Sequence, residues 1–257
     1  MTQPVRIALA GALGRMGLAL EAALLEREDL IMTGKFDRPG STGPGLTTAE
    51  AALSKADVVI DFTTAEASTV LAETLAVKGG PAMVIGATGF TDAQAARLAL
   101  AAKALPIVRT GNYSLGVNML AGLVALAARA LSPEAYDIEI FEAHHKRKVD
   151  APSGTARLLG EAAAQARGQV LSEIAVRGRD GLTGPRRAGD IGFSVLRGGG
   201  IVGDHAVIFA AEDETITLSH SARDRSLFAR GALEAARWLA SRSPGEYDMQ
   251  DVLGLKP

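Results

Sequence analysis

The residues with the most specific chemistry lie in one segment, E-A-H-H-K-R-K-V-D-A-P-S-G-T, which runs from Glu142 to Thr155. Two of the chain's four histidines, His144 and His145, are adjacent here, and the cations of the K-R-K run at 146–148 follow them directly. A histidine can donate or accept a proton near neutral pH. Neighbouring positive charge favours the neutral imidazole and attracts acidic ligands. The pattern therefore predicts an acid/base residue in a pocket that binds carboxylates.

A strand and a helix are expected on either side of this charged segment. Residues 136–141 are apolar and alternate, which is typical of a strand, and the Ala/Leu-rich run that ends at Arg167 indicates a helix. Ser153 can cap that helix and Pro152 prevents an earlier start. Gly154 would let an anion approach the helix N-terminus closely. The alternative is a solvated basic turn with an incidental histidine pair, which the combination of these features disfavours.

Composition sets the broad class of the protein. A chain of 257 residues can form one large domain or two modest ones, and its 47% hydrophobic and 4% aromatic content implies a core of Ala, Leu and Val. A net charge of −2 gives no sign of nucleic-acid or anionic-membrane binding. The absence of cysteine excludes disulfides, thiolate metal sites and cysteine nucleophiles, and no metal site is expected. With no signal peptide and no long apolar run, we expect a soluble cytoplasmic protein.

A glycine motif near the N-terminus suggests a cofactor. The apolar run Val5–Ala10 predicts a strand, the glycines at 11, 14 and 17 follow it, and a Leu/Ala-rich helix extends to about Arg27. Strand, glycine-rich turn and helix form the context that a dinucleotide fingerprint requires. The spacing is G-x-x-G-x-x-G, so Leu13 stands where the commoner motif has its second glycine.

An acidic residue follows at the distance expected for a ribose contact. Leu30–Phe36 predicts a second strand, and Asp37 comes about 20 residues after Gly17, where an acid binds the adenosine ribose hydroxyls. Arg38 comes next and could instead hold a 2′-phosphate. The alternative is a tight glycine turn with an ordinary surface Asp-Arg pair. NADH and NADPH both remain open as cofactors.

The rest of the first half alternates strands with helices. Strands are predicted at 57–62, 82–85 and 106–110, which implies an α/β fold with a doubly wound parallel sheet. The polar strand ends would line the crevice where such sheets bind ligands, although each alone is an ordinary strand-to-helix loop. These ends are Asp61–Thr63, Gly86–Thr88 and Thr110–Ser114.

The second half has a different order of predicted strands and helices. A long helix is predicted at 116–131, and the strands at 191–196, 205–211 and 215–220 follow one another with only turns between, as in an antiparallel or mixed sheet. The loop at 177–189 contains four arginines and four glycines. It could be a mobile solvated loop, or equally a flap, an anion site or a subunit contact.

Taken together, these motifs resemble the 4-hydroxy-tetrahydrodipicolinate reductase family, also called dihydrodipicolinate reductases. The matching stretches are V-R-I-A-L-A-G-A-L-G-R-M-G, D-F-T, I-G-A-T-G-F, G-N-Y-S-L-G-V-N, the histidine segment with its P-S-G-T-A, and the closing D-M-Q-D-V-L. They span nearly the whole chain. The histidine segment is specific to that family, whereas the glycine loop is shared with many dehydrogenases.

The resemblance implies a fold, an activity and an assembly. Residues 1–114 and 224–257 would form a Rossmann-like dinucleotide-binding domain, and residues 115–223 an α+β domain with a mixed sheet for substrate binding and oligomerisation. The activity would be the NAD(P)H-dependent reduction, with loss of water, of 4-hydroxy-tetrahydrodipicolinate in diaminopimelate and lysine biosynthesis. The substrate is a small cyclic dicarboxylate. The assembly would be a homotetramer formed through sheets of the second domain.

The resemblance also assigns roles to individual residues. His144 would be the acid/base residue and Lys148 the cationic donor, while His145, Gly154 and Thr155 would grip the substrate carboxylates. The residues implied for cofactor binding are Gly11, Ala12, Leu13, Gly14, Arg15, Met16, Asp37, Arg38, Gly86, Ala87, Thr88, Thr110, Gly111, Asn112 and Tyr113. Ala87 and Tyr113 replace a threonine and a phenylalanine often found in the family, and neither change removes a needed functional group.

Two other functions are compatible with part of the sequence. Another two-domain NAD(P)-dependent dehydrogenase would share the glycine loop but would not need H-H-K-R-K followed by P-S-G-T. A non-catalytic dinucleotide sensor should have lost His144 or Lys148, and both are present.

Overall fold

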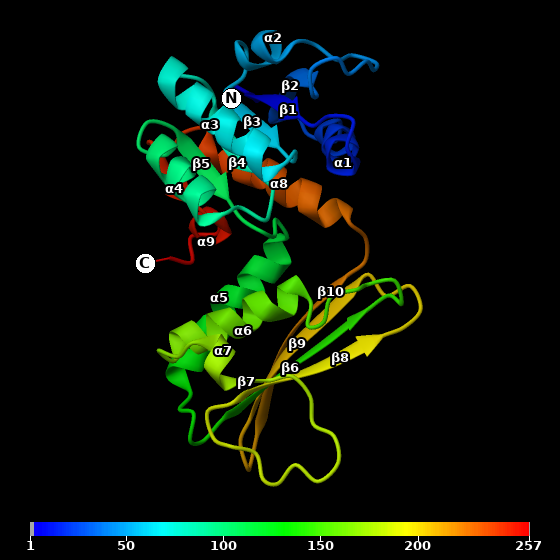
Figure 1. The fold of residues 1–257 in the computed structure, drawn as a ribbon, viewed down its shortest axis with the longest axis vertical. Coiled ribbons are helices and arrows are strands. Elements are labelled where there is room, and N and C mark those ends of the chain that lie inside the picture. Colours follow the sequence, from blue (N-terminus) through cyan, green and yellow to red (C-terminus); the bar gives the residue numbers. More distant parts are fainter. Residues whose placement is uncertain (1–2, 257) are drawn as a thin grey trace. The chain divides into compact units, whose positions relative to one another are not determined.

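The alternating strands and helices of the first half, together with one strand from near the end of the chain, build a six-stranded parallel sheet (Figure 1). Its strands, in spatial order, are β11 (Gly245–Tyr247), β5 (Pro106–Arg109), β4 (Ala82–Ile85), β3 (Val58–Asp61), β1 (Val5–Ala10) and β2 (Leu30–Phe36). The chain runs outward from β1 to β2 and then returns to β3 on the other side of β1. The strand order therefore reverses between β1 and β3, where Ala10 pairs with Asp61. Ligands bind open α/β sheets at such a reversal.

The computed structural model describes residues 3–256, which divide into two compact units. The first unit holds the described residues up to Leu115 together with those from Ser226 onward, and the second holds Gly116–Arg225. The parallel sheet belongs to the first unit.

Helices cover both faces of the parallel sheet, so its central strands are buried on both sides. Ile7 and Leu9 of β1 pack with α1 (Arg15–Leu24), α8 (Ser226–Leu239) and α9 (Met249–Val252). Ala8 and Ala10 pack on the other face with the remaining helices of this unit. These are α2 (Ala49–Leu53), α3 (Ala65–Lys78) and α4 (Asp92–Ala101). Burial on both faces explains why these strands are continuous apolar runs.

The helix ends in this unit follow local sequence signals. The hydroxyls of Thr64 and Thr91 accept hydrogen bonds from N–H groups of the first turns of α3 and α4 and so cap these helices. Helix α3 ends at Gly79, whose φ of 69° is left-handed and therefore favours glycine.

A five-stranded mixed sheet organises the second unit (Figure 1). Strands β10 (Thr215–Ala222), β9 (Gly203–Ala210) and β6 (Asp137–His144) are antiparallel, whereas β8 (Ile191–Arg197) and β7 (Ala175–Val176) continue from β6 in parallel. One face packs under α5 (Leu115–Ala130), α6 (Gly154–Ala166) and the short α7 (Leu171–Ile174). The mixed sheet expected from the clustered strands is confirmed.

Strand β6 ends at His144, so the expectation that it would end at Phe141 and leave the histidine pair on a loop was wrong for His144. The ladder explains the longer strand, because β6 pairs with β8 as far as His144 and Arg197. Side chains alternate along a strand. Glu142 and His144 therefore lie on the helix-covered face, with Ile138 and Ile140.

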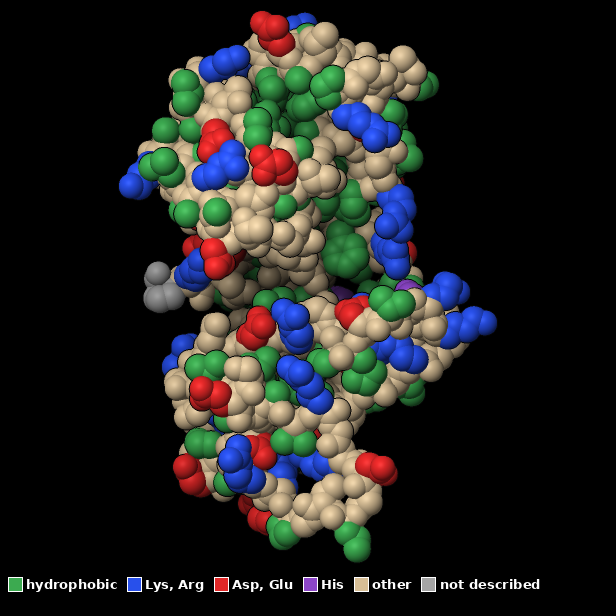
Figure 2. Space-filling view, in the orientation of Figure 1, with side chains coloured by type: hydrophobic (Ala, Val, Ile, Leu, Met, Phe, Trp, Pro, Cys, Tyr) green, Lys and Arg blue, Asp and Glu red, His purple; other side chains and the backbone are tan. Residues whose placement is uncertain are grey.

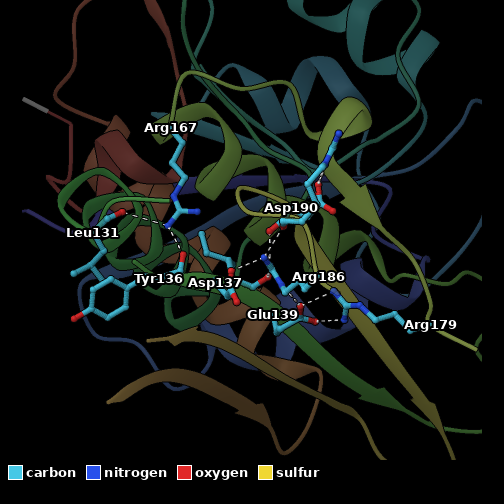
Figure 3. A network of polar contacts seen from close by, with 10 residues as sticks. Leu131, Tyr136, Asp137, Glu139, Arg167, Arg179, Arg186 and Asp190 are labelled. Atoms are coloured by element: carbon cyan, nitrogen blue, oxygen red, sulfur yellow. Dashed lines mark hydrogen bonds and ion pairs between the residues drawn. The ribbon is translucent and has the colours of Figure 1, made fainter. Parts of the chain in front are cut away.

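The arginine-rich loop between β7 and β8 is fastened to β6 by ion pairs (Figure 3). Arg186 donates to Glu139 at 3.0 Å, to Asp137 at 2.6 Å, and to the carbonyl oxygens of Ile138 and Asp190. Arg179 donates to both oxygens of Glu139, at 3.1 and 2.9 Å. These two guanidinium groups bind carboxylates of their own chain, which disfavours an anion-binding role for them.

Replacing Arg186 with methionine should lower the free energy of unfolding by about 1–3 kcal/mol, because two carboxylates lose a shared, half-buried donor. The side chain of Arg186 is 19% exposed, whereas that of the neighbouring Arg187 is 71% exposed. Arg187→Met should therefore change stability by no more than about 0.5 kcal/mol. Urea denaturation of the two variants checks this difference, and equal effects would contradict it.

Within residues 3–256, no helix combines the length and apolar character needed to cross a membrane.

Candidate active site

The glycine loop after β1 has the geometry that a dinucleotide needs. Gly11 has a φ of +73°, and a Cβ at this position would lie 2.9 Å from Thr63 Cγ2, so a larger residue does not fit. A Cβ at Gly17 would lie 2.4 Å from the carbonyl oxygen of Gly11, so α1 packs tightly on the loop. Gly14 is the N-cap of α1 and has no side chain to cover the first N–H groups of the helix. A pyrophosphate can be bound by such uncovered N–H groups.

Asp37, predicted to contact the ribose, also supports the glycine loop. One oxygen of its carboxylate accepts the N–H of Leu13 at 3.0 Å, and the other accepts the N–H of Arg38 at 2.8 Å. Each carboxylate oxygen has a further lone pair for a ligand hydroxyl. The contact between Asp37 and Leu13 joins the ends of β1 and β2, and it was not foreseen from the sequence.

A hollow of about 590 Å³ lies at the ends of β4 and β5. It brings together four residues predicted to bind the cofactor: Ala87, Thr88, Thr110 and Gly111. Its other lining residues are Gly89, Phe90, Arg109, Glu246, Tyr247, Asp248 and Lys256. The contribution of the segment around β11 was not foreseen, because a three-residue strand has too short a pattern to recognise.

Two other predicted cofactor residues have structural roles. The hydroxyl of Tyr113 lies 2.7 Å from the carbonyl oxygen of Ile85 and 3.1 Å from that of Val108, and the side chain is buried. Burial raises the pKa of Tyr113 well above its usual range. A Cβ at Gly86 would lie 2.1 Å from the ring of Phe62. The structure thus places the Tyr113 side chain in the core. The absence of a side chain at Gly86 leaves room for the ring of Phe62, which follows β3.

In the second unit, a buried carboxylate lies at the centre of the histidine segment. The side chain of Glu142 is 0% exposed, and one of its oxygens is 2.6 Å from Nδ1 of His144. Arg197 donates to both oxygens, at 2.8 and 2.7 Å, and the N–H of Ser153 donates at 2.9 Å. Burial acts to raise the pKa of Glu142, but these hydrogen bonds outweigh it and hold the pKa below its ordinary value.

A second histidine, His205 of β9, lies against His144. The two ring centroids are 5.1 Å apart and the rings meet edge to face. Nε2 of His205 is 3.2 Å from the hydroxyl of Ser153, which also accepts the N–H of Ala156 and so caps α6 as expected. Burial lowers the pKa of His205 to about 4, so it is neutral at physiological pH. The sequence signal that could have identified His205 is the alternation of buried and partly exposed side chains along β9, which places His205 on the buried face.

The remaining predicted substrate residues lie on the loop after β6 and at the start of α6. Burial is the main cause that lowers the pKa of His145. Lys148 is half-buried and its Nζ lies 2.8 Å from a carboxylate oxygen of Asp150. Open space surrounds the Cα of Gly154, which precedes Thr155 in the first turn of α6. In Figure 2, Lys and Arg side chains gather around the loop that follows β6, with histidine visible among them.

Among residues 3–256, no group of three or more His, Cys, Asp and Glu side chains is arranged to hold a metal ion.

Comparisons with known proteins show the family of the chain. A model for "Dihydrodipicolinate reductase, N-terminus" matches residues 5–113, and one for "Dihydrodipicolinate reductase, C-terminus" matches residues 116–253. The chain is 62% identical to 4-hydroxy-tetrahydrodipicolinate reductase of Caulobacter vibrioides, with 100% of both chains covered. It is 50% identical to the enzyme of the same name from Rhizobium rhizogenes, with 98% of this chain and 97% of the relative covered.

Solved structures support the fold. A dipicolinate-bound dihydrodipicolinate reductase from Paenisporosarcina superposes with a TM-score of 0.80 at 21% identity, covering 97% of this chain and 99% of that one. A C. glutamicum DAP dehydrogenase in complex with DAP gives a TM-score of 0.60 at 14% identity, covering 100% and 97%. At 21% and 14% identity, these similarities show a shared fold and do not by themselves show a shared function.

Proposed function

This chain belongs to the dihydrodipicolinate reductase family, and on that premise we propose that its second unit binds the substrate through the segment from His144 to Thr155. The protein is an NAD(P)H-dependent 4-hydroxy-tetrahydrodipicolinate reductase of diaminopimelate and lysine biosynthesis. The family expected from the motifs is confirmed. Full-length identity of 62% rules out the alternative of another two-domain dehydrogenase. We also propose a cytoplasmic location, because the reduced pyridine nucleotide that the reaction consumes is a cytoplasmic metabolite.

The first unit provides the residues that would hold the cofactor. When bound, NAD(P)H supplies the hydride. Gly11 and Gly14 would let the pyrophosphate approach the start of α1, and Asp37 would accept hydrogen bonds from the adenosine ribose. Thr88 and Thr110 would meet the nicotinamide half, which is supported by their place in the hollow at the ends of β4 and β5.

The substrate carboxylates would be held by the start of α6 and by the basic loop. Gly154 and Thr155 lie in the first turn of α6, where a Cβ added at Gly154 would meet no atom within 4 Å, and a helix N-terminus favours anions. His145 and Lys148 would add donors from the preceding loop. The single observation that carries this proposal is Glu142, whose carboxylate contacts both His144 and the N–H of Ser153. The proposed proton donor and the proposed carboxylate-binding helix end are thus both hydrogen-bonded to the carboxylate of Glu142.

His144 would supply the proton that completes the reaction. The substrate loses the hydroxyl group at C4 and a proton at the neighbouring carbon as water, hydride is then added at C4, and the resulting enamine takes up a proton at the neighbouring carbon. Since Nδ1 contacts Glu142, His144 would donate this proton from Nε2 of its doubly protonated ring, which leaves the neutral ring with its proton on Nδ1. The ammonium group of Lys148 would stabilise negative charge that develops on the substrate.

Pyridine-2,6-dicarboxylate should inhibit competitively against the imine substrate. It is flat, similar in size to the substrate, and carries two carboxylates for the donors at the start of α6. Pyridine-2-carboxylate has only one carboxylate and should bind at least about tenfold more weakly, which corresponds to one lost charge-assisted contact of about 1.4 kcal/mol. Steady-state inhibition kinetics test this. No inhibition at millimolar concentration, or equal inhibition by both compounds, would argue against a dicarboxylate pocket.

Both cofactors should be used, with at most about a tenfold preference, because Asp37 disfavours a 2′-phosphate and Arg38 favours it at a partly exposed rim. Arg38→Ala should weaken the use of NADPH selectively, and more strongly at low salt. Asp37→Ala should weaken the use of both cofactors, since it also removes the acceptor for the N–H of Leu13. The measurement is kcat/KM for each cofactor in the three proteins. An Arg38→Ala variant that affects both cofactors equally would show that Arg38 does not contact the phosphate.

We further propose that the enzyme is a homotetramer assembled through the uncovered face of the five-stranded sheet, as the family resemblance implies. This face carries the exposed side chains of Phe141 and Leu196. These two side chains lie on neighbouring strands, β6 and β8. Sedimentation velocity gives the mass directly, and a monomer at micromolar concentration would contradict the proposal.

A further inference from the structure

We propose that Glu142, paired with Arg197, is a positioning residue of the reaction. Its carboxylate fixes the tautomer and the direction of His144 and also anchors Ser153 at the start of α6. The inference rests on the proposed role of His144 as proton donor. It adds a requirement, because the proton donor and the carboxylate-binding helix end depend on one buried group.

The hydrogen bonds around Glu142 determine which nitrogen of His144 carries a proton. Arg197 donates to Oε2 at 2.8 Å and to Oε1 at 2.7 Å, and the N–H of Ser153 donates to Oε1 at 2.9 Å. An ionised carboxylate can only accept hydrogen bonds. Nδ1 of His144, 2.6 Å from Oε2, must therefore be the donor. Neutral His144 then carries its proton on Nδ1, and Nε2 is the nitrogen that exchanges a proton with the substrate.

Glu142 can fix the tautomer of His144 only if its carboxylate is ionised, and the surrounding hydrogen bonds favour the ionised form. The pKa of Glu142 is held below its ordinary value, although burial alone would raise it. Removing one member of a buried ion pair is costly, since the other charge is left without a partner. Arg197 also donates to the carbonyl oxygen of Asp150 at 2.7 Å. The Glu142–Arg197 pair thus holds the loop that carries Lys148 as well.

The surroundings of the His144 ring leave it little freedom. A Cβ at Gly203 would lie 3.0 Å from Nε2, so a larger residue would crowd that nitrogen. The ring of His205 packs edge to face on the same ring, with centroids 5.1 Å apart. Glu142 holds the ring at Nδ1, while Gly203 and His205 define the space around its other side. A rotation that broke the bond to Glu142 would leave a buried carboxylate with one donor fewer.

Glu139 provides a matched control on the same strand. It is also paired with two arginines, Arg179 and Arg186, and it is partly buried. However, it lies on the opposite face of the sheet, in register with Gly192. Its contacts fasten the loop between β7 and β8 and include none of the proposed substrate residues. Glu139→Gln therefore makes the same chemical change without touching His144.

The tautomer can be measured directly by ¹⁵N NMR of protein labelled at histidine, because the chain has only four histidines. His144→Gln identifies the signals of His144. In the wild-type protein, neutral His144 should be the Nδ1–H form. In Glu142→Gln, the amide oxygen would accept from Arg197 and Ser153, so the amide N–H would face Nδ1 of His144. Nδ1 must then accept, and the Nε2–H form or a mixture should appear. A wild-type Nε2–H form would overturn the inference, even if Glu142→Gln failed to fold.

Steady-state kinetics supply the second readout. Glu142→Gln should lower kcat about 10²-fold or more, as when an orienting carboxylate of a catalytic histidine becomes an amide. It should also raise the KM of the imine, whereas the KM of NAD(P)H stays unchanged. Glu139→Gln should keep kcat within about twofold of wild type, because it alters no transition-state contact. Wild-type kinetics in a folded Glu142→Gln protein would overturn the inference.

The two proposals can fail separately. If His144→Gln retains turnover, the role of His144 as proton donor is wrong, while the tautomer measurement still decides the role of Glu142. If His144→Gln loses turnover but Glu142→Gln retains both turnover and tautomer, only the inference about Glu142 is wrong. Thermal melting of each variant shows which proteins are folded. If Glu142→Gln is unfolded, Arg197→Met tests the same pair by removing the cation that keeps Glu142 ionised, and an unchanged kcat and tautomer there would count against the inference.

Discussion

Replacing His144 with glutamine should lower kcat about 10²–10⁴-fold, because the reaction loses its proton donor. The KM of the imine should change little, since the proposed carboxylate contacts lie on the helix α6 and its preceding loop. Glutamine retains a polar side chain at the end of β6 but cannot transfer a proton near neutral pH. Steady-state kinetics with saturating NAD(P)H measure both parameters. A variant with near wild-type turnover would remove His144 from the mechanism.

His220 is the control for this substitution. It lies on β10 in register with His205, on the same face of the sheet, and burial is the main cause that lowers its pKa. It has no assigned role in binding or proton transfer. His220→Gln should therefore leave kcat within about twofold of wild type, since no transition-state contact is lost. A large loss in both variants would indicate a general disturbance of the sheet.

Replacing Lys148 with alanine should lower kcat/KM about 10²–10³-fold, as expected when a group that stabilises developing charge is removed. Both kcat and the KM of the imine should suffer, because the ammonium group would act on the bound carboxylates and on the transition state. Its partner Asp150 is 52% exposed at the side chain, so it remains solvated without Lys148 and folding should be preserved. Unchanged values of both parameters would show that Lys148 is only part of a solvated surface.

Arg147 tests whether position or charge alone matters. It precedes Lys148 on the same loop and is exposed, whereas Lys148 is half-buried. Arg147→Ala removes the same unit of charge and should lower kcat/KM no more than about fivefold, the size of an exposed charge contact of about 1 kcal/mol. Equal losses in the two variants would mean that the loop acts through its general positive field.

The elements that could be predicted from the sequence are those fixed by local patterns. The strands Val5–Ala10 and Leu30–Phe36 have the predicted bounds. Each is a largely apolar run, and the glycine, proline or charged residues that flank it show where the strand begins and ends. The hydroxyl of Ser153 caps α6 as predicted, since a cap depends on residues only a few positions apart.

The features that were missed depend on pairing between distant residues. Glu142 and Arg197 lie in different strands of one sheet, and only the register of β6 against β8 brings them together. His205 reaches His144 through the pairing of β9 with β6 in the same way. The hint available in advance was the spacing of Glu142 and His144, which places them on one face if the strand continues to His144.

His144, held by Glu142, is proposed to lie beside a helix end that binds a substrate carboxylate. A crystal structure of the enzyme with pyridine-2,6-dicarboxylate would reveal this arrangement. The expected complex has one carboxylate on the N–H groups of Gly154 and Thr155, with Nε2 of His144 facing the ligand and Nδ1 still bonded to Glu142. A ligand bound away from α6, or a His144 ring that has left Glu142 and presents Nδ1 to the ligand, would contradict the account.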